Sequence, residues 1–487
     1  MTRYEPVIGL EVHAELLTRS KMFCGCAVVD STQAPPNTVT CPVCLGMPGV
    51  LPVINARAVE MALLVGLALD CEIPPFSQFA RKNYFYPDLP KGYQISQYEH
   101  PLAVNGHLDV DLPGGGAKRI GIIRAHLEED TGKLTHTGDG HSLVDLNRAG
   151  VPLLEIVSAP DIHSAAEAEA YARKLRAILQ YLGVNHGDMS KGVLRFEANV
   201  SVRPVGSDEL RTRTEIKNLN SIRSMVRAIE KEVERQIRLW ESGEGVKQAT
   251  LGWDDVAGRI IIQRVKESAS DYRYFPEPDL PIVVMSREQV EATRARLPEL
   301  PDARRDRFMA DLGLSREDAA ALVADRAVAD YYEAALAAGA EPKQAANFVL
   351  GEIFRLMNAE SLPREAIDQI RVTPGALAGL LALVNARTIN LNTAKRVLDI
   401  LYAEGGDPAQ IVAAHGLAQI TDETPIRATI EQVLDAHPDE VAAYLAGQEK
   451  LAKFLMGQVM RALRGQGQPQ VVQALLEDAL AARRGKS

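Results

Sequence analysis

The chain has 487 residues, of which 46% are hydrophobic and 24% charged, and its formal net charge is −10. This composition is ordinary for a globular protein, and no apolar run reaches the roughly 18 residues that a membrane span needs. The acidic balance argues against nucleic-acid binding through bulk charge, although a local basic patch is compatible with it. Residues Met1 to Glu5 carry no signal or transit pattern, so we expect a cytoplasmic protein.

The first predicted strand, Ile8 to Leu16, alternates between apolar and polar residues. Strand side chains point to two faces in turn, so Glu11, His13 and Glu15 share one face and the apolar residues share the other. Carboxylates and an imidazole at this spacing suit a hard divalent cation. The alternative is a solvated face of an antiparallel sheet, which alternates in the same way. We assign Glu15 to such a surface.

Four of the five cysteines lie close together in the sequence, as Cys24-x-Cys26 and, after fourteen residues, Cys41-Pro-x-Cys44. In an intracellular protein, paired thiols of this kind indicate a structural zinc site before they indicate disulfides. The alternative is a set of reduced thiols in a knuckle that holds no metal. Cys71 lies in an apolar stretch and is predicted to be a small buried side chain.

Three later segments repeat the alternation of the first strand, and helical spacing with end signals predicts helices over 55–70, 164–182 and 221–240. The polar rows are Arg124, His126 and Glu128 in 120–129, which ends in Glu128-Glu129-Asp130; Arg195, Glu197 and Asn199 in 193–203; and Arg211, Arg213, Glu215 and Lys217 in 210–217. These strands predict a sheet with an apolar back and a polar front.

Two segments mix aromatic and charged residues, Arg81 to Asp88 and Asp271 to Pro276. Aromatic rings can stack on unpaired bases while basic side chains meet phosphates. The alternative for each segment is a packed loop with an aromatic anchor. Both interpretations stay open at this point.

From about residue 295 onward the sequence is rich in Ala, Leu, Glu and Arg with helical spacing. We expect a helical region to about residue 410 and a smaller helical tail after it. The tail is locally basic. This pattern fits a nucleic-acid contact and a solvated helix face equally well. The last part of the tail, from residue 450 onward, carries seven basic residues: Lys450, Lys453, Arg461, Arg464, Arg483, Arg484 and Lys486.

The polar front of the predicted sheet has a chemical logic. Carboxylates bind Mg²⁺, and Arg and Lys hold phosphate oxygens and compensate charge as a phosphoryl group moves. From their phase along the strands, we predict that Arg195, Arg213 and Lys217 contact phosphate. The nearest string to a phosphate-binding glycine loop, Asp130 to Leu134, lacks its first glycine and final Ser or Thr. No serine or cysteine nucleophile stands in a suitable context, so we do not expect this chain to hydrolyse an amide itself.

These strings together resemble the GatB family, the B subunits of the bacterial glutamyl-tRNA(Gln)/aspartyl-tRNA(Asn) amidotransferase. The resemblance covers essentially the whole chain, and its motifs are long and specific. The matching strings are Val7–His13, Arg81–Asp88, Lys91–Gln97, His126–Lys133, Ser142–Ser158, Ala198–Pro204, Thr214–Asn220, Asp271–Pro281 and Phe454–Met460.

The resemblance implies an α+β fold in three domains. Residues 1–293 would form a cradle-like catalytic domain with an antiparallel sheet related to that of glutamine synthetase, and a zinc knuckle at 24–44. An all-α helical domain, 294–410, and a small α-helical tail domain, 411–487, would follow, and the tail would contact tRNA.

The resemblance also implies an activity and partners. ATP would phosphorylate the side-chain carboxylate of the misacylated Glu-tRNA(Gln) or Asp-tRNA(Asn), and ammonia would then displace phosphate to form the amide. In a heterotrimer, the glutaminase or A subunit would release that ammonia from glutamine, and the small C subunit would join the other two. Matched positions imply Mg²⁺ binding by Glu11, His13, Glu129 and Glu215, with Glu128 close by, and zinc binding by the four cysteines.

Two departures from the family pattern stand out. Glu197 occupies a position where the family usually has aspartate, and Gln248-Ala249-Thr250-Leu251 stands where it usually reads Gln-Glu-Thr-Arg. The second departure puts a role for that loop in doubt. The competing hypothesis is a non-catalytic, zinc-containing tRNA-binding scaffold. An archaeal tRNA(Gln)-specific relative carries a large additional domain, for which this chain has no room.

Overall fold

The computed structural model describes residues 4–112, 114–265, 272–420, 422–463 and 466–484. Asp271, Arg464 and Lys486, which the sequence analysis singled out, lie outside these ranges. The chain divides into two compact units, one up to Pro301 and one from Asp302 onward. No helix in the described ranges is long and apolar enough to cross a membrane.

The first unit is built on one large mixed sheet, which confirms the α+β class. Among the described residues it has eight strands, and only β11 and β12 pair in parallel. In sheet order the strands are β13 (Arg259–Val265), β12 (Ala249–Asp254), β11 (Thr214–Leu219), β10 (Leu194–Pro204), β1 (Tyr4–Glu15), β9 (Pro152–Ser158), β6 (Ala117–Glu129) and β5 (Ala103–Asp111).

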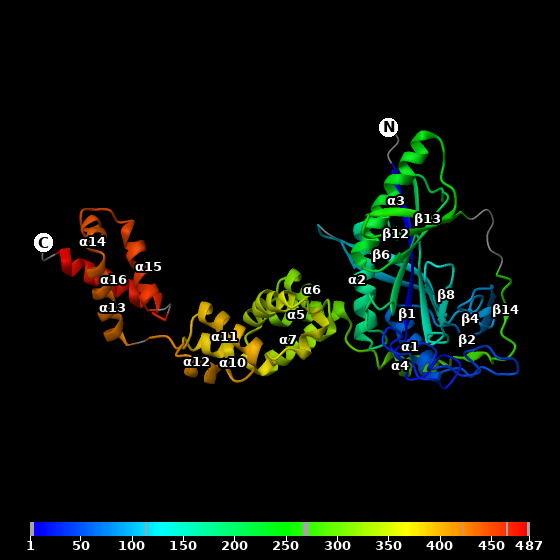
Figure 1. The fold of residues 1–487 in the computed structure, drawn as a ribbon, viewed down its shortest axis with the longest axis horizontal. Helices are drawn as coiled ribbons and strands as arrows, with labels where there is room; N and C mark the ends of the chain where they lie inside the picture. The colour runs from blue at the N-terminus through cyan, green and yellow to red at the C-terminus, as the bar shows by residue number, and fades with distance from the viewer. Residues whose placement is uncertain (1–3, 113, 266–271, 421, 464–465, 485–487) are drawn as a thin grey trace. The chain divides into compact units, whose positions relative to one another are not determined.

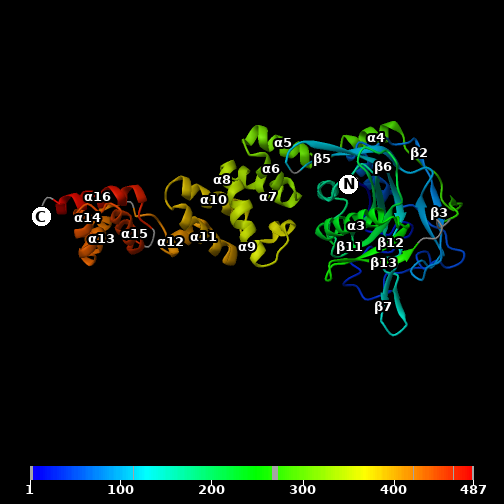
Figure 2. The same cartoon turned by 90° about the horizontal axis from the view of Figure 1, so that it is seen from above.

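Three helices cover the apolar face of this sheet: α1 (Ala56–Ala68), α2 (Ala165–Tyr181) and α3 (Ile222–Ser242) (Figures 1 and 2). The alternation of β1 explains the layer, because Ile8, Leu10 and Val12 are fully buried while the polar residues between them face the other way. Each helix begins at a side chain that caps its first turn, Asn55, Ser164 and Ser221 respectively. The three predicted helices are thus confirmed.

Smaller sheets lie beside the large one. The strands β14 (Phe275–Pro276), β3 (Phe79–Asn83) and β4 (Tyr93–Gln97) form a three-stranded sheet, and two pairs are β15 (Val283–Val284) with β2 (Phe76–Ser77) and β7 (Lys133–His136) with β8 (Ser142–Asp145). The helix α4 (Arg287–Arg294) closes the unit and packs on α1.

The second unit is helical and contains two separate hydrophobic clusters, one within 308–417 and one within 426–480. Its elements are α5 (Pro301–Leu312), α6 (Arg316–Val323), α7 (Arg326–Ala337), α8 (Pro342–Asn347), η1 (Phe348–Ile353), α9 (Phe354–Ala359), η2 (Arg364–Gln369), α10 (Pro374–Asn385), α11 (Leu391–Glu404), α12 (Pro408–Ala414), α13 (Glu423–Ala436), α14 (Pro438–Leu445), α15 (Leu451–Ala462) and α16 (Pro469–Arg484). A domain boundary between 410 and 411 stays a prediction.

Two expectations about local structure were wrong. Strand β11 begins at Thr214, so Arg211 and Arg213 precede it instead of lying within a strand from residue 210. Residues 249–251, expected in a loop, belong to β12, where Ala249 and Leu251 are buried and fill the core.

Candidate active site

The strand register brings the polar residues of the sheet front together. Glu11 of β1 lies directly opposite Glu197 of β10, and His13 lies opposite Glu155 of β9. One strand further, Glu215 of β11 lies opposite Asn199 of β10. Because opposite residues in adjacent strands have neighbouring side chains, charged groups that are far apart in the sequence meet on one face.

The first group, here called the carboxylate cluster, consists of Glu11, Glu197 and Glu215, whose oxygens lie within 4.8 Å of one another. The Asn199 amide donates a hydrogen bond to Glu11 at 2.8 Å, and Lys217 Nζ lies 2.8 Å from Glu197 and 3.3 Å from Glu215. Burial, followed by the charges of Glu155 and Glu197, raises the pKa of Glu11. A positive charge between these carboxylates would relieve that repulsion.

An irregularity of the sheet helps to form this cluster. The register of β10 and β11 shifts between Phe196 and Ala198, and Asn218 has a φ of +62°. A bulge of this kind redirects the side chains beside it. Thr250 of β12 donates a hydrogen bond of 3.1 Å to Glu215. The segment 248–251, which differs from the usual family pattern, therefore supports one of the carboxylates.

The second group, here called the histidine cluster, consists of His13, Glu128 and Glu155, whose ligand atoms also lie within 4.8 Å of one another. His13 Nε2 is 3.3 Å from Glu155 and 3.8 Å from Glu128. His126 Nε2 lies 3.7 Å from Glu155 and 3.9 Å from Glu128, so each carboxylate is close to both imidazoles.

Charges perturb the histidine cluster strongly. Burial lowers the pKa of His13, but the hydrogen bond and charge of Glu155 outweigh burial and raise it to about 9. Burial lowers the pKa of His126 to about 4, and burial with the charge of Glu155 raises that of Glu128 to about 7. Perturbed titratable groups in one buried patch are typical of a functional site.

The predicted Mg²⁺ ligands do not all meet. Glu11 and Glu215 belong to the carboxylate cluster, whereas His13 and Glu128 belong to the histidine cluster. Glu129 belongs to neither group: its side chain accepts a hydrogen bond from Ile95 N–H and pairs with Lys91. Adjacent strand residues point to opposite faces, which separates Glu129 from Glu128.

Sequence reasoning missed Glu155 as a candidate. Its strand, Pro152 to Ser158, is a run of apolar residues broken by this one carboxylate. A single Glu in an otherwise apolar central strand was the available signal, because a buried charge needs partners.

The three basic candidates have different environments. Lys217 touches two members of the carboxylate cluster, and Arg213 is exposed beside it. Arg195 is already paired, 2.8 Å from the buried Asp130 and 3.7 Å from Glu15. Glu15 is therefore not the surface carboxylate that we expected, since its side chain is only 16% exposed.

A cavity of about 150 Å³ adjoins the carboxylate cluster. Its lining combines a glycine, two hydroxyl groups, an amide, a carboxylate and two guanidinium groups with apolar side chains; the polar members and the glycine are Gly9, Glu11, Ser158, Asn199, Ser201, Arg211 and Arg213. A concave site that mixes apolar walls and a few convergent polar groups is suited to a small ligand.

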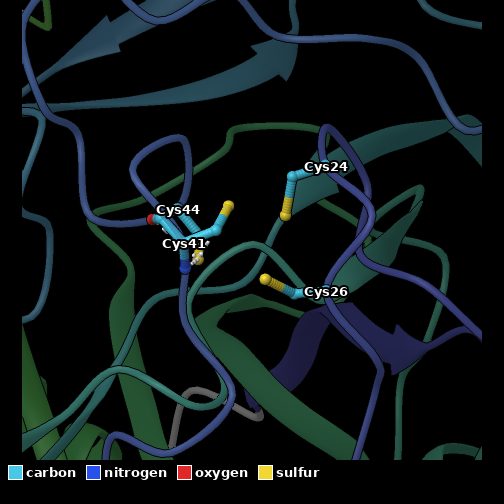
Figure 3. A group of neighbouring side chains, drawn as sticks. All are labelled: Cys24, Cys26, Cys41 and Cys44. Carbon is cyan, nitrogen blue, oxygen red and sulfur yellow. Dashed lines mark hydrogen bonds between the residues drawn. The ribbon is translucent and has the colours of Figure 1, made fainter.

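The four clustered cysteines come together in space as well. Their sulfur atoms lie within 4.8 Å of one another, and those of Cys41 and Cys44 are 3.9 Å apart (Figure 3). A tetrahedral zinc with bonds of about 2.3 Å would place sulfurs about 3.8 Å apart. The hydrogen bond from Cys24 lowers the pKa of Cys44 to about 4, which favours the thiolate that binds metal. This group could hold a metal ion.

The tail residues are less basic in space than in sequence. Arg483 Nη2 lies 2.5 Å from Glu431 and 2.6 Å from Asp435, which compensates its charge. Lys450, Lys453 and Arg461 are exposed. A tRNA contact by the tail is not tested by these observations and stays a prediction.

The class of protein follows from its family, because residues 6–291 match the GatB/GatE catalytic domain and residues 330–480 match the GatB domain. The chain is 51% identical to the B subunit of the aspartyl/glutamyl-tRNA(Asn/Gln) amidotransferase of Thermodesulfovibrio yellowstonii, over 97% of its length and 98% of the relative's. It is also 51% identical to the corresponding B subunit of Roseiflexus castenholzii and 49% identical to that of Caldicellulosiruptor saccharolyticus. Each of these two matches covers 98% of this chain and 99% of the relative. The chain belongs to this family of amidotransferase B subunits.

Proposed function

We propose that this chain is the subunit that activates and amidates misacylated tRNA in a glutamine-dependent amidotransferase. Its substrates would be Glu-tRNA(Gln), Asp-tRNA(Asn), or both. The observation that carries the proposal is the pairing of the carboxylate cluster with the histidine cluster on one sheet face, beside a cavity that Arg213 lines. A scaffold that only binds tRNA has no need of six converging ligand groups.

The reaction has two steps. The side-chain carboxylate of the aminoacyl group attacks the γ-phosphorus of ATP, an acyl phosphate forms, and ADP leaves. Ammonia then attacks the acyl carbon, phosphate leaves, and a proton is lost to give the amide. Phosphorylation is needed because a carboxylate oxygen is a poor leaving group, whereas phosphate is a good one.

The residues present fit divalent cations. Glu11, Glu197 and Glu215 offer only oxygen ligands, which Mg²⁺ prefers, and their mutual repulsion in a half-buried patch favours a cation between them. His13, Glu128 and Glu155 would hold a second cation. Such cations would supply charge neutralisation for phosphoryl transfer.

The chain's own side chains would position ATP. The cavity beside Glu11 is the proposed nucleotide site, with Arg213 free to meet phosphate oxygens at its rim and Lys217 holding the carboxylates in place. Arg195, in contrast, would act through Asp130 to keep β10 and the end of β6 together.

The proposal includes partners and a metal. Ammonia would come from the glutaminase or A subunit, the small C subunit would join the other two in a heterotrimer, and the tail would contact the tRNA. Cys24, Cys26, Cys41 and Cys44 would hold a structural zinc ion. The complex would work in the cytoplasm, where tRNA is aminoacylated.

An amidation assay of the reconstituted complex, with Glu-tRNA(Gln) and Asp-tRNA(Asn) supplied separately, tests the proposal. We expect amide formation and ATP hydrolysis that depend on the misacylated tRNA. A complex that binds both tRNAs yet hydrolyses no ATP in their presence would show a scaffold instead.

A further inference from the structure

The strand β4 lies along β6 at the margin of the histidine cluster. The Gln94 amide donates to Glu129 O at 2.7 Å, and the Ser96 hydroxyl donates to the Glu128 carboxylate at 3.2 Å. Leu127 N–H donates to the Gln97 side chain at 3.0 Å. Residues further along β4 therefore meet residues earlier in β6.

Tyr98 follows this strand, and the guanidinium carbon of Arg124, a polar residue of β6 that precedes His126, lies over the Tyr98 ring, 5.7 Å from its centre. Two strand residues span about 6.6 Å, so the backbone of Tyr98 lies roughly that far from that of Ser96, whose hydroxyl contacts the Glu128 carboxylate. Nevertheless 45% of Tyr98 is exposed. An exposed aromatic ring therefore stands near the proposed reacting centre.

Tyr98 is supported from behind by a second ring. Tyr274 stacks on it with ring centres 4.1 Å apart and planes 5° from parallel. Tyr274 precedes β14, which the ion pair of Arg81 with Glu277, at 2.7 Å, holds against β3. The stacked pair is thus fixed to two strands of the small sheet and is organised before any ligand arrives.

Basic and polar groups surround the pair. Lys82 lies 5.2 Å from the centre of the Tyr272 ring, which itself meets Tyr274 edge to face. On another side is an open hollow with apolar, aromatic and hydrogen-bonding walls; its lining includes Gln78, Tyr98, Glu99, His100, Tyr274 and Phe275. Stacking rings flanked by cations and by donors and acceptors are the components of a site for an unpaired base.

We propose that Tyr98, backed by Tyr274, is the stacking seat for the unpaired terminal base of the acylated tRNA. This inference rests on the proposed function, in which the reacting carboxylate is attached to the terminal ribose. Only that ribose and the esterified amino acid separate the base from the carboxylate, just as two residues of β4 and the Ser96–Glu128 hydrogen bond link Tyr98 to the histidine cluster. Stacking the base would fix the distance between the acyl group and the two clusters, which is the positioning that phosphoryl transfer requires.

A fluorescent base tests the seat directly. The terminal adenosine of a misacylated tRNA is replaced by a 2-aminopurine nucleotide, whose fluorescence falls when it stacks, and the tRNA is mixed with the assembled amidotransferase. We expect quenching by the wild-type complex and by Tyr98→Phe and Tyr274→Phe, which keep both rings. Tyr98→Ala should abolish the quenching and raise KM for tRNA roughly tenfold, with KM for ATP unchanged.

Tyr98→Leu serves as a second variant, since it keeps an apolar side chain without an aromatic ring. It therefore separates the loss of stacking from the misfolding that Tyr98→Ala could cause. Equal quenching in Tyr98→Leu and wild type would overturn the inference, as would equal losses in Tyr98→Phe and Tyr98→Leu. Amidation by the wild-type complex tests the proposed function separately. A complex that amidates without quenching would overturn only the stacking seat, and one that quenches without amidating would overturn only the function.

Discussion

Glu11 and Glu197 lie directly opposite each other on the neighbouring strands β1 and β10, and both belong to the cluster completed by Glu215. Like charges placed opposite each other destabilise a sheet unless something compensates them. Lys217 compensates part of this repulsion through its contacts with Glu197 and Glu215. The arrangement is therefore costly for the fold alone, and this cost supports the proposed binding of a cation between these carboxylates.

We predict that Glu197→Gln and Glu11→Gln raise the Mg²⁺ concentration for half-maximal amidation by on the order of tenfold or more, because each loses an anionic ligand. The measurement is amidation rate against Mg²⁺ concentration at saturating ATP. Glu5→Gln is the matched control, since Glu5 lies on the same face of β1 but pairs with Arg203 at 2.7 Å. An unchanged Mg²⁺ dependence in both cluster variants would contradict the assignment.

The four clustered cysteines are predicted to bind zinc. The purified protein should contain one zinc per chain, and Cys44→Ser should remove it and lower the unfolding temperature, because the metal links two loops. Elemental analysis and thermal unfolding measure the two effects. Cys71→Ser should retain zinc, since burial raises the pKa of this thiol to about 12 and it lies outside the cluster. A metal-free wild-type protein would exclude the knuckle as a zinc site.

Arg195 and Arg213 should respond differently to the same change. Arg195→Gln removes a 2.8 Å partner from the buried Asp130 and should cost on the order of 2 kcal/mol of unfolding free energy, with Arg148 and the Thr131 N–H left to compensate. Arg213→Gln should leave stability unchanged and raise KM for ATP several-fold. Denaturant unfolding and ATP kinetics separate the two. A stable Arg195→Gln with a raised KM for ATP would restore its predicted phosphate contact.

Glu167 provides a prediction about pH. Burial raises its pKa, but the 2.6 Å ion pair with Lys118 and the 2.7 Å hydrogen bond from His163 N–H outweigh burial, so its pKa is lowered from 4.5. A lowered pKa contributes stability that is present above the unfolded-state pKa and is lost as pH falls through the folded-state pKa. Glu167→Gln should therefore cost about 1 kcal/mol at pH 7, and the difference from wild type should shrink below about pH 4.5.

The measurement is the unfolding free energy of both proteins across this pH range. Glu169→Gln, at an exposed position of the same helix paired with Arg173, should change stability by less than about 0.5 kcal/mol at any pH. A difference for Glu167→Gln that grows on acidification would reverse the sign of the argument.

The sequence allowed prediction of the face on which each strand carries its polar residues, but not of the residues that meet across strands. Alternation identified Glu11, His13, Glu128 and Glu197, since it depends only on the backbone. Register depends on the whole sheet. Alternation therefore could not reveal that Glu11 and His13, whose backbones are about 6.6 Å apart along β1, belong to two different clusters. Glu155 was hidden for the same reason, because its neighbours in sequence are apolar and its partners lie on β1 and β6.

Glu129 and Glu155 distinguish the ligand set suggested by the family resemblance from the one that the geometry favours. Glu129 is 3% exposed and binds Lys91 and the Ile95 N–H, away from both clusters. Glu129→Gln keeps the shape and one acceptor oxygen but removes the charge that Lys91 pairs with. We therefore expect it to leave the Mg²⁺ concentration for half-maximal amidation unchanged, whatever it does to the maximal rate. Glu155→Gln, measured alongside, should raise that concentration by on the order of tenfold. The opposite pattern, a raised requirement in Glu129→Gln and none in Glu155→Gln, would show that the ligand set from the resemblance is correct and that Lys91 yields its partner to the metal.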